Sequence, residues 1–192
     1  MRMFVHRSSR LELRPLRLGD YAAWFKAYTQ HGPAKNRWDH DPYPVAKCSP
    51  QMFKNLVQRL RALAQKDEYY RYHVFLRSTG ELVGHVDFNI YERGCLNYAN
   101  FGYILHSSFW GRGYGTEMGR LALWIGHRRL KLQRLEAATD LDNRRSQRLA
   151  RRIGMRSDGI RKAYWWQEGR WDDQRLFVSV GSDYSATGPA GE

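Results

Sequence analysis

Three glycines at alternate positions mark the segment from Phe109 to Glu117, which reads FWGRGYGTE. It follows a strand-like run and precedes a run with helical spacing. Glycine lets a backbone adopt positive φ and approach a ligand closely, and free N–H groups at the start of a helix attract anionic oxygens. The segment therefore predicts a strand-to-helix turn that binds a diphosphate. A tight turn without a ligand is the alternative that the segment alone leaves open.

The spacing of the three glycines narrows the class of phosphate ligand that this turn could bind. A dinucleotide fingerprint needs a glycine three positions after Gly113 or Gly115, where Thr116 and Met118 stand, so this class is disfavoured. A nucleotide-hydrolase phosphate loop needs Gly-Lys-Ser/Thr, and no lysine follows these glycines. A short turn whose amides hold a diphosphate remains.

Length and composition predict one soluble domain. The chain has 192 residues, 42% of them hydrophobic, which is enough for one buried core, and we expect a single domain over residues 1–180. Residues 181–192 are small and polar and are expected to form a disordered tail. Two cysteines, no apolar leader and no long apolar run predict a reduced, cytoplasmic protein without membrane contact.

The formal net charge of +13 predicts anionic partners through long-range attraction. A cofactor with several phosphates is one such partner. RNA, including that of the ribosome, is another, and its binding would be sensitive to salt. A solvated basic surface is the alternative, because no aromatic RNA-binding strand motif is visible.

Hydrophobic periodicity divides the chain into about seven strands and four helices. Strands are expected over 10–16, 72–77, 82–91, 98–105, 135–139, 160–167 and 171–180. Helices are expected over 21–29, 49–66, from the glycine turn to 127, and over 143–153. Residues 31–44 lack a steady period and are expected to form a loop. The three central strands should form an antiparallel meander.

The helix predicted over 143–153 is amphipathic. A rotation of about 100° per residue places Ser146 on an inward stripe with Leu149, Ala150 and Ile153. The other face carries Arg144, Arg145, Arg148, Arg151 and Arg152. The Ser146 hydroxyl either bonds the carbonyl of the preceding turn or faces a site. The arginines form a solvated face or contact phosphates of a cofactor or RNA.

The order of the predicted strands and helices along the chain resembles that of the GNAT acetyltransferase superfamily over roughly residues 11–180. The family turn Gln/Arg-x-x-Gly-x-Gly/Ala corresponds to the six residues from Trp110 to Gly115, and a bulky first residue is similar to the RimJ/RimL branch. RLELRPL at 10–16, FGYIL at 101–105, NRRS at 143–146 and GRWDD at 169–173 resemble the same branch. The resemblance implies an α+β, three-layer GNAT fold with a mixed, mostly antiparallel sheet and helices on both faces.

The same resemblance implies acetyl-CoA (coenzyme A) as cofactor and no metal. The pyrophosphate would bind the turn residues Gly111, Arg112, Gly113, Tyr114, Gly115 and Thr116. The pantetheine arm would pair with the end of a strand where two strands diverge, at Tyr103, Ile104 and Leu105. Asn143 matches the family position that bonds this arm.

Attack of an amine on an acetyl thioester needs an acceptor for the amine proton and an acid for the thiolate. Many relatives use a tyrosine of the fourth helix as the acid, but Ala150 stands at that position. The RimL-like pattern implies Ser146 instead. The base stays open, because Trp165 stands where RimL-like enzymes have a glutamate. The candidates are Asp87, Glu92, His40 and Asp39.

The irregular loop is expected to bind the acceptor through Trp38, Asp39 and His40. Tyr43, Tyr164, Trp165 and Trp166 either line the same groove or cover the sheet. An α-amine with a pKa of about 7.7–8.0 is neutral at pH 7 far more often than a lysine with a pKa of about 10.4. The lack of an obvious strong base therefore favours an N-terminal α-amine.

The resemblance implies an N-acetyltransferase whose acceptor is the N-terminus of a protein such as a ribosomal protein, and the branch allows a homodimer. Two alternatives stay open. One is acetylation of a small amine, such as an antibiotic, an amino sugar or a polyamine. The other is a non-catalytic module on the same fold that binds RNA or the ribosome.

Overall fold

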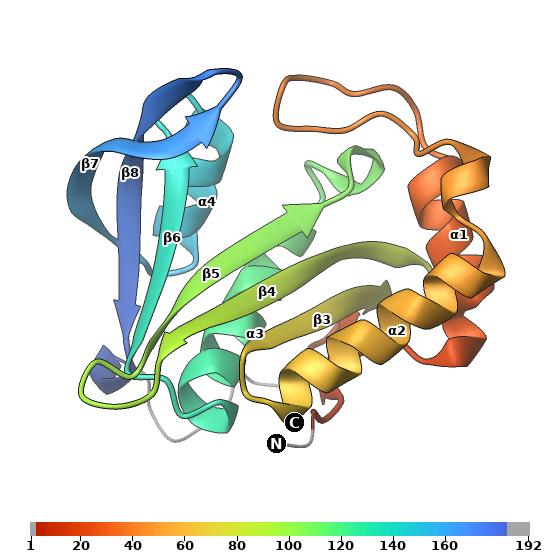
Figure 1. Ribbon diagram of the computed structural model, residues 1–192, viewed down its shortest axis with the longest axis horizontal. Helices are drawn as coiled ribbons and strands as arrows, with labels where there is room; N and C mark the ends of the chain where they lie inside the picture. Colours follow the sequence, from red (N-terminus) through yellow and green to blue (C-terminus); the bar gives the residue numbers. More distant parts are fainter. Residues whose placement is uncertain (1–2, 184–192) are drawn as a thin grey trace.

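The computed structural model describes residues 3–183 and contains one open sheet of eight strands in the order β1-β2-β3-β4-β5-β6-β8-β7 (Figure 1). The strands are β1 (His6–Arg7), β2 (Leu11–Arg14), β3 (Tyr69–Leu76), β4 (Leu82–Glu92), β5 (Tyr98–Leu105), β6 (Arg134–Asp140), β7 (Arg156–Gln167) and β8 (Arg170–Val180). Only β5 and β6 pair in parallel. The predicted mixed, mostly antiparallel sheet is confirmed, and the added strand is the two-residue β1.

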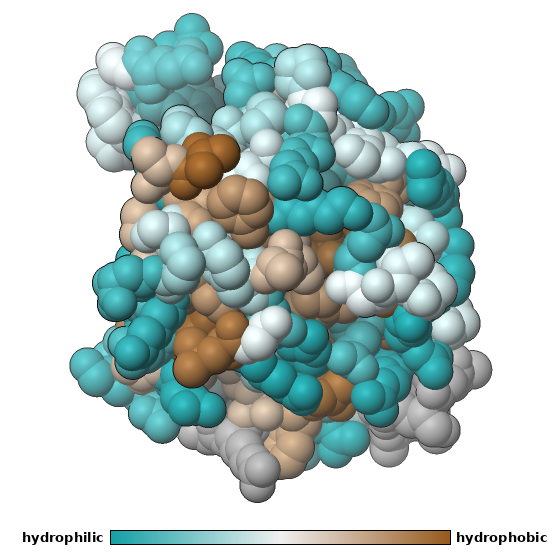
Figure 2. All heavy atoms as spheres, turned by 90° about the vertical axis from the view of Figure 1, so that its right-hand side faces the viewer, coloured by the Kyte–Doolittle hydropathy of each residue, from teal (hydrophilic) through white to brown (hydrophobic). Residues whose placement is uncertain are grey.

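Helices cover both faces of the sheet, which confirms the predicted layers. They are α1 (Tyr21–Thr29), α2 (Pro50–Gln65), α3 (Tyr114–Trp124) and α4 (Arg144–Arg152). On one face, α1 and α2 pack through Trp24, Tyr28 and Phe53. On the other face, α3 and α4 join the main core. The side that is to the right in Figure 1 presents a mixture of hydrophilic residues and separate hydrophobic patches (Figure 2).

Polar side chains cap the starts of two helices. Ser49 caps α2 by accepting a hydrogen bond from the N–H of Met52 at 3.3 Å, and Pro50 is the first helical residue. Asn143 caps α4, because its Oδ1 accepts the N–H of Ser146 at 3.1 Å. Each cap joins residues within one turn, and the two helices begin at the predicted starts of the ranges 49–66 and 143–153 to within one residue.

Two segments differ from the predicted pattern. The helix expected to reach residue 127 ends at Trp124 and continues as one π-helical turn, Ile125–Arg129, closed by Leu130 N–H to the carbonyl of Ile125 at 2.9 Å. The expected tail begins with a short 3-10 turn, Gly181–Asp183, whose Gly181 N–H donates to the carbonyl of Gln133 at 2.8 Å. Residues 184–192 lie outside the described residues. Within 3–183, no helix combines the length and the apolar character required to cross a bilayer.

The strands β5 and β6 pair only at their first residues. Their register runs from Tyr98 opposite Arg134 to Asn100 opposite Glu136, and beyond that point the two strands diverge (Figure 1). On its other edge β5 stays paired with β4 up to Leu105. The second half of β5 therefore has one backbone edge that β6 does not cover.

Gly84 of β4 lies against the free half of β5. It pairs with Leu105, and a Cβ at this position would stand 2.1 Å from the carbonyl oxygen of Ile104. A backbone atom cannot move aside as a flexible side chain can. The absence of a side chain at Gly84 therefore sets how closely β4 approaches the end of β5.

We expect Gly84→Ala to lower the free energy of unfolding by more than about 2 kcal/mol, because the added methyl meets backbone. Gly19→Ala is the matched control, since no atom lies within 4 Å of a Cβ placed there. Its free energy of unfolding should change by less than about 0.5 kcal/mol. Urea unfolding of both variants checks the prediction, and equal stabilities would contradict it.

A partly buried carboxylate, that of Glu117, ties the N-terminal strands to the start of α3. Oε1 of Glu117 accepts hydrogen bonds from Ser8 Oγ at 2.7 Å, Ser9 Oγ at 3.0 Å and Arg10 N–H at 2.8 Å, and Oε2 accepts from Arg10 Nε at 2.7 Å. The Arg10 guanidinium also donates to the carbonyl of Arg112 in the glycine turn at 3.0 Å. Partial burial alone would raise the pKa of Glu117, but these hydrogen bonds outweigh it and leave the pKa below its usual value.

Because the folded-state pKa of Glu117 is lowered, its ionised form stabilises the fold above the ordinary glutamate range, and this stability is lost as the pH falls through the folded pKa. Glu117→Gln should therefore cost about 1–3 kcal/mol at pH 7, and the difference should shrink below about pH 4. Glu168→Gln, at an exposed turn, is the control and should have no such pH dependence. Urea unfolding at both pH values tests this, and a cost that does not change with pH would refute it.

Candidate functional site

A cleft of about 450 Å³ opens where β5 and β6 diverge. Its walls come from the second half of β5, the glycine turn, α4 and the loop over residues 31–44. Most of the predicted site residues line it: Trp38, Asp39, His40, Tyr103, Ile104, Leu105, Gly111, Gly113, Gly115, Thr116, Asn143 and Ser146. The cleft therefore brings together three groups of residues that were predicted separately.

The glycine turn has the geometry predicted for it. Gly111 and Gly113 have φ values of 81° and 82°, and Gly113 is the left-handed N-cap of α3. A Cβ at Gly115 would make ordinary contacts with Leu149 at 3.4 Å and Leu105 at 3.7 Å, so α3 begins beside α4 and β5. A helix that starts without a capping side chain presents its first N–H groups to the cleft, and this arrangement suits an anion.

Two turn residues contribute no side chain to the cleft lining. The Arg112 guanidinium lies 5.9 Å from the ring of Phe109. The ring of Tyr114 lies under the Arg10 guanidinium at 4.5 Å. Their side chains are used in the packing of the turn, so any contact of Arg112 and Tyr114 with a phosphate is left to their backbone N–H groups.

The two predicted catalytic carboxylates of β4 do not line the cleft. Asp87 lies beside Gly102, but both its oxygens accept hydrogen bonds from Arg71, at 2.6 and 3.1 Å. Glu92 pairs with Tyr98, at the end of β5 that is remote from the glycine turn. The structure therefore does not bring Glu92 to the site, because β4 carries it five positions past Asp87 along an extended strand.

A hydroxyl pair lies at the base of the cleft. Oη of Tyr103 is 2.9 Å from Oγ of Ser146, and it also donates to the carbonyl of Ser146 at 3.1 Å. Burial raises the pKa of Tyr103 to about 12, although the hydrogen bond with Ser146 acts in the opposite direction. The phenol is thus neutral at physiological pH and holds a proton beside the serine. Residues 103 and 146 come from different elements, so the pairing had no signal in the sequence.

Three arginines of α4 line the cleft beside Ser146 and Leu149. They are Arg145, Arg148 and Arg152, and the guanidinium of Arg145 lies 3.8 Å from the ring centroid of Trp110. All five arginines of this helix are exposed, as predicted, and these three also line the cleft, which leaves the predicted contact with cofactor phosphates open to them. Their spacing of three and four positions is that of a single helical stripe. They give the cleft a cationic wall.

The loop over residues 31–44 is tied across the cleft mouth to the end of β6. Nε1 of Trp38 donates to Oδ2 of Asp140 at 2.5 Å, and Arg37 forms an ion pair with Asp142 at 2.6 Å. In Figure 1 the loop extends from α1 toward α4 across the top of the molecule. Asp140 was not predicted as a site residue, since its partner is more than 100 positions away. It holds the loop over the cleft.

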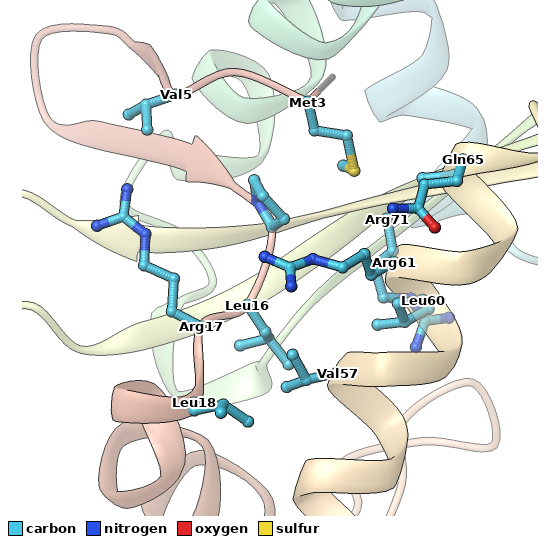
Figure 3. Close-up of a pocket in the computed structure, with 12 residues that line it drawn as sticks. Met3, Val5, Leu16, Arg17, Leu18, Val57, Leu60, Arg61, Gln65 and Arg71 are labelled. Atoms are coloured by element: carbon cyan, nitrogen blue, oxygen red, sulfur yellow. The ribbon is translucent and has the colours of Figure 1, made fainter. Parts of the chain in front are cut away.

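A larger hollow, of about 790 Å³, lies elsewhere, between α2, the N-terminal segment and the connection from β2 to α1 (Figure 3). Its lining is apolar apart from Arg17, Arg61, Gln65 and Arg71. None of these lining groups readily exchanges a proton near neutral pH. We therefore place the chemistry in the smaller cleft. Across residues 3–183, no group of His, Cys, Asp and Glu side chains is arranged to hold a metal ion.

Comparison with known proteins finds similarity to acetyltransferases. The family model "Acetyltransferase (GNAT) domain" matches residues 10–156. "Probable N-acetyltransferase YjcK" of Bacillus subtilis (strain 168) is 32% identical over 119 residues, 62% of this chain and 66% of that protein. The ribosomal protein uS5-alanine N-acetyltransferase of Escherichia coli (strain K12) is 24% identical over 156 residues, 79% of this chain and 80% of that protein.

A solved structure extends the similarity to the fold. Mycobacterium smegmatis RimJ, in complex with CoA-disulfide, superposes with a TM-score of 0.70 at 26% identity, covering 94% of this chain and 88% of RimJ. GNAT acetyltransferases use acetyl-CoA, and the glycine turn, the uncovered β5 edge and the cationic wall suit its pyrophosphate, pantetheine arm and phosphates. By its matched domain and its fold, the chain belongs to the GNAT acetyltransferase family.

Proposed function

We propose that the protein is an N-acetyltransferase that moves the acetyl group of acetyl-CoA to the N-terminal α-amine of a protein, such as a ribosomal protein. The observation that carries the proposal is the joining of three parts in one cleft. These parts are the phosphate-binding turn, the unpaired edge of β5 and the hydroxyl pair Tyr103–Ser146. Bound acetyl-CoA would supply a thioester carbonyl for attack by the amine.

Binding would combine charge and backbone hydrogen bonds. The N–H groups at the start of α3 would receive the pyrophosphate, with Arg145, Arg148 and Arg152 nearby as cations. The backbone edge at residues 103–105 would pair with the amide groups of the pantetheine arm, because buried N–H and C=O groups need partners. Asn143 caps α4 through its Oδ1, which leaves its amide nitrogen for the ligand.

The hydroxyl pair would serve as the acid for the departing thiolate. Ser146 lines the cleft, and Tyr103 behind it carries a proton that burial holds on the phenol. A tyrosine of β5 thus stands next to the serine, whereas Ala150 fills the position of α4 where many relatives carry a tyrosine. We assign Ser146 the contact with sulfur and Tyr103 the role of supplying the proton to Ser146.

A carboxylate at the cleft mouth, that of Asp39, supports a cationic acceptor. Burial alone would raise the pKa of Asp39, but the N–H of Lys35 and the hydroxyl of Ser107 donate to its carboxylate and leave the pKa below its usual value. Asp39 is therefore ionised at neutral pH and attracts an ammonium group despite the net charge of +13. The relatives named for ribosomal alanine acetylation favour a protein N-terminus over a small amine.

An acetyl-CoA assay over peptides that begin with Ala, Ser, Met or Asp, beside aminoglycosides and polyamines, tests the proposal. We expect turnover with at least one peptide and a loss of about 10²-fold or more in kcat for Ser146→Ala and for Tyr103→Phe, with coenzyme A affinity retained. Ser157→Ala, at an exposed position of β7, is the control and should keep full activity.

The outcomes of this assay separate the candidate functions. Turnover only with small amines would refute the α-amine assignment and leave the acetyltransferase. No turnover with any amine, together with tight and salt-sensitive RNA binding, would favour a non-catalytic module. Full activity in both hydroxyl variants would contradict the assigned acid.

A further inference from the structure

The amine that attacks the thioester must lose a proton, and the structure narrows the candidates for its acceptor. Glu92 lies at the remote end of β5. Asp87 is held by the two hydrogen bonds from Arg71, so its oxygens already have a cationic partner. Asp39 accepts hydrogen bonds from Lys35 N–H and Ser107, which lower its pKa after the opposing effect of burial and make it a weak base. His40 is the remaining candidate.

A backbone carbonyl determines the tautomer of His40. Its Nδ1 lies 3.2 Å from the carbonyl oxygen of Asp41. A carbonyl can only accept, so Nδ1 carries the hydrogen and the neutral ring keeps its lone pair on Nε2. Within residues 3–183, Nε2 of His40 has no hydrogen-bond partner, and it is not a buried atom. Since His40 lines the cleft, this lone pair is available to a ligand.

The ring of His40 is held by four aromatic neighbours. It stacks on Tyr28 with an interplanar angle of 5°, and it contacts His31, Tyr43 and His106 with centroids 5.1, 5.4 and 5.9 Å away. Tyr28, His31 and His106 do not line the cleft, which leaves His40 as the member of this cluster that faces the ligand. These contacts restrict rotation of the ring and orient Nε2.

Two carboxylates, those of Asp39 and Asp41, flank His40 in the loop. Burial lowers the pKa of His106 to about 4, so this neighbour is neutral near pH 7 and does not repel an imidazolium. Lys35 directs its ammonium group to the carbonyl of Ser107 at 3.2 Å and lies 5.8 Å from the ring of Trp110.

We infer that Nε2 of His40 accepts the proton of the attacking amine, an assignment that rests on the proposed acetyltransferase function. The amine nitrogen forms a bond to the acetyl carbon while the bond from that carbon to sulfur breaks. The nitrogen's proton passes to Nε2, directly or through one water, and a second proton passes from the Tyr103–Ser146 pair to sulfur. His40 then releases its proton to solvent and the hydroxyl pair regains one, so the protein returns to its first state.

The pH dependence of kcat/KM tests this assignment with the peptide that gives the highest turnover. At low pH, the wild-type protein should lose activity because two groups become protonated, the amine of the substrate and His40. A plot of log(kcat/KM) against pH should therefore approach a limiting slope of two on its acidic side. His40→Asn keeps a donor for the Asp41 carbonyl but lacks Nε2. It should lower kcat by about 10²-fold or more and reduce the limiting slope to one.

His31→Asn is the matched control. His31 likewise bonds a neighbouring carbonyl through Nδ1, that of Gly32 at 2.8 Å, and belongs to the same ring cluster, but it does not line the cleft. Its limiting slope should stay at two even if packing changes lower its rate. A slope of two in His40→Asn, with wild-type turnover present, would overturn the inference and leave the proposed function intact. Absence of wild-type turnover would count against the proposed function itself.

Two measurements that need no turnover test the role of His40 independently. Long-range ¹H–¹⁵N spectra of the free protein should show His40 as the Nδ1–H tautomer, with Nε2 gaining a proton as the pH is lowered. Calorimetric titration with coenzyme A should give His40→Asn an affinity within about threefold of wild type, because the residue is assigned to the amine and not to the cofactor. A neutral Nε2–H tautomer would overturn the inference.

Discussion

The divergence of β5 from β6 is the constraint on which the rest of the site depends. The strands share only three register pairs before they part, so the backbone of β5 from Phe101 to Leu105 has one edge without a neighbouring strand. Backbone N–H and C=O groups require partners when they are buried. A ligand that carries amide groups can supply them. In the proposed function, the opening between the strands therefore sets where the cofactor binds and how it is oriented.

The surrounding elements keep this opening in place. Gly84 allows β4 to approach β5 to a distance that no side chain would permit, and α3 begins at Gly115 beside Leu105 of β5 and Leu149 of α4. On the mouth side, Trp38 bonds Asp140 at the end of β6 and holds the loop over the cleft. The glycine turn, the Tyr103–Ser146 hydroxyl pair and His40 all line one cavity as a result. The proposed acid and the proposed base therefore stand on different walls of the cleft.

The sequence predicted the parts of this site that depend on local spacing. The glycine turn and the irregular loop over residues 31–44 each have signals within a few residues. The structure was needed for contacts between distant positions, such as Tyr103 with Ser146 and Trp38 with Asp140. Helical periodicity could identify the Ser146 stripe and the exposed arginines, but it could not show that three of these arginines border the cleft.

The exposure of the aromatic residues on the last hairpin also could not be predicted from the sequence. Trp165 and Trp166 were expected to line the acceptor groove or to cover the sheet, yet each is 56% exposed on the β7–β8 hairpin. Strand alternation assigns the two residues to opposite faces, but it does not show that β7 is the last strand of the sheet. Burial at a sheet edge depends on which elements pack there, and this is a property of the whole fold.

The proposed function places acetyl-CoA in the cleft between β5 and β6, and not in the larger hollow beside α2. Amide hydrogen exchange with and without saturating coenzyme A distinguishes the two sites. We expect slower exchange, by about tenfold or more, in the segments 101–106 and 111–117, and unchanged exchange over 57–65 of α2. Protection over 57–65 without protection in the two cleft segments would show instead that coenzyme A binds in the larger hollow.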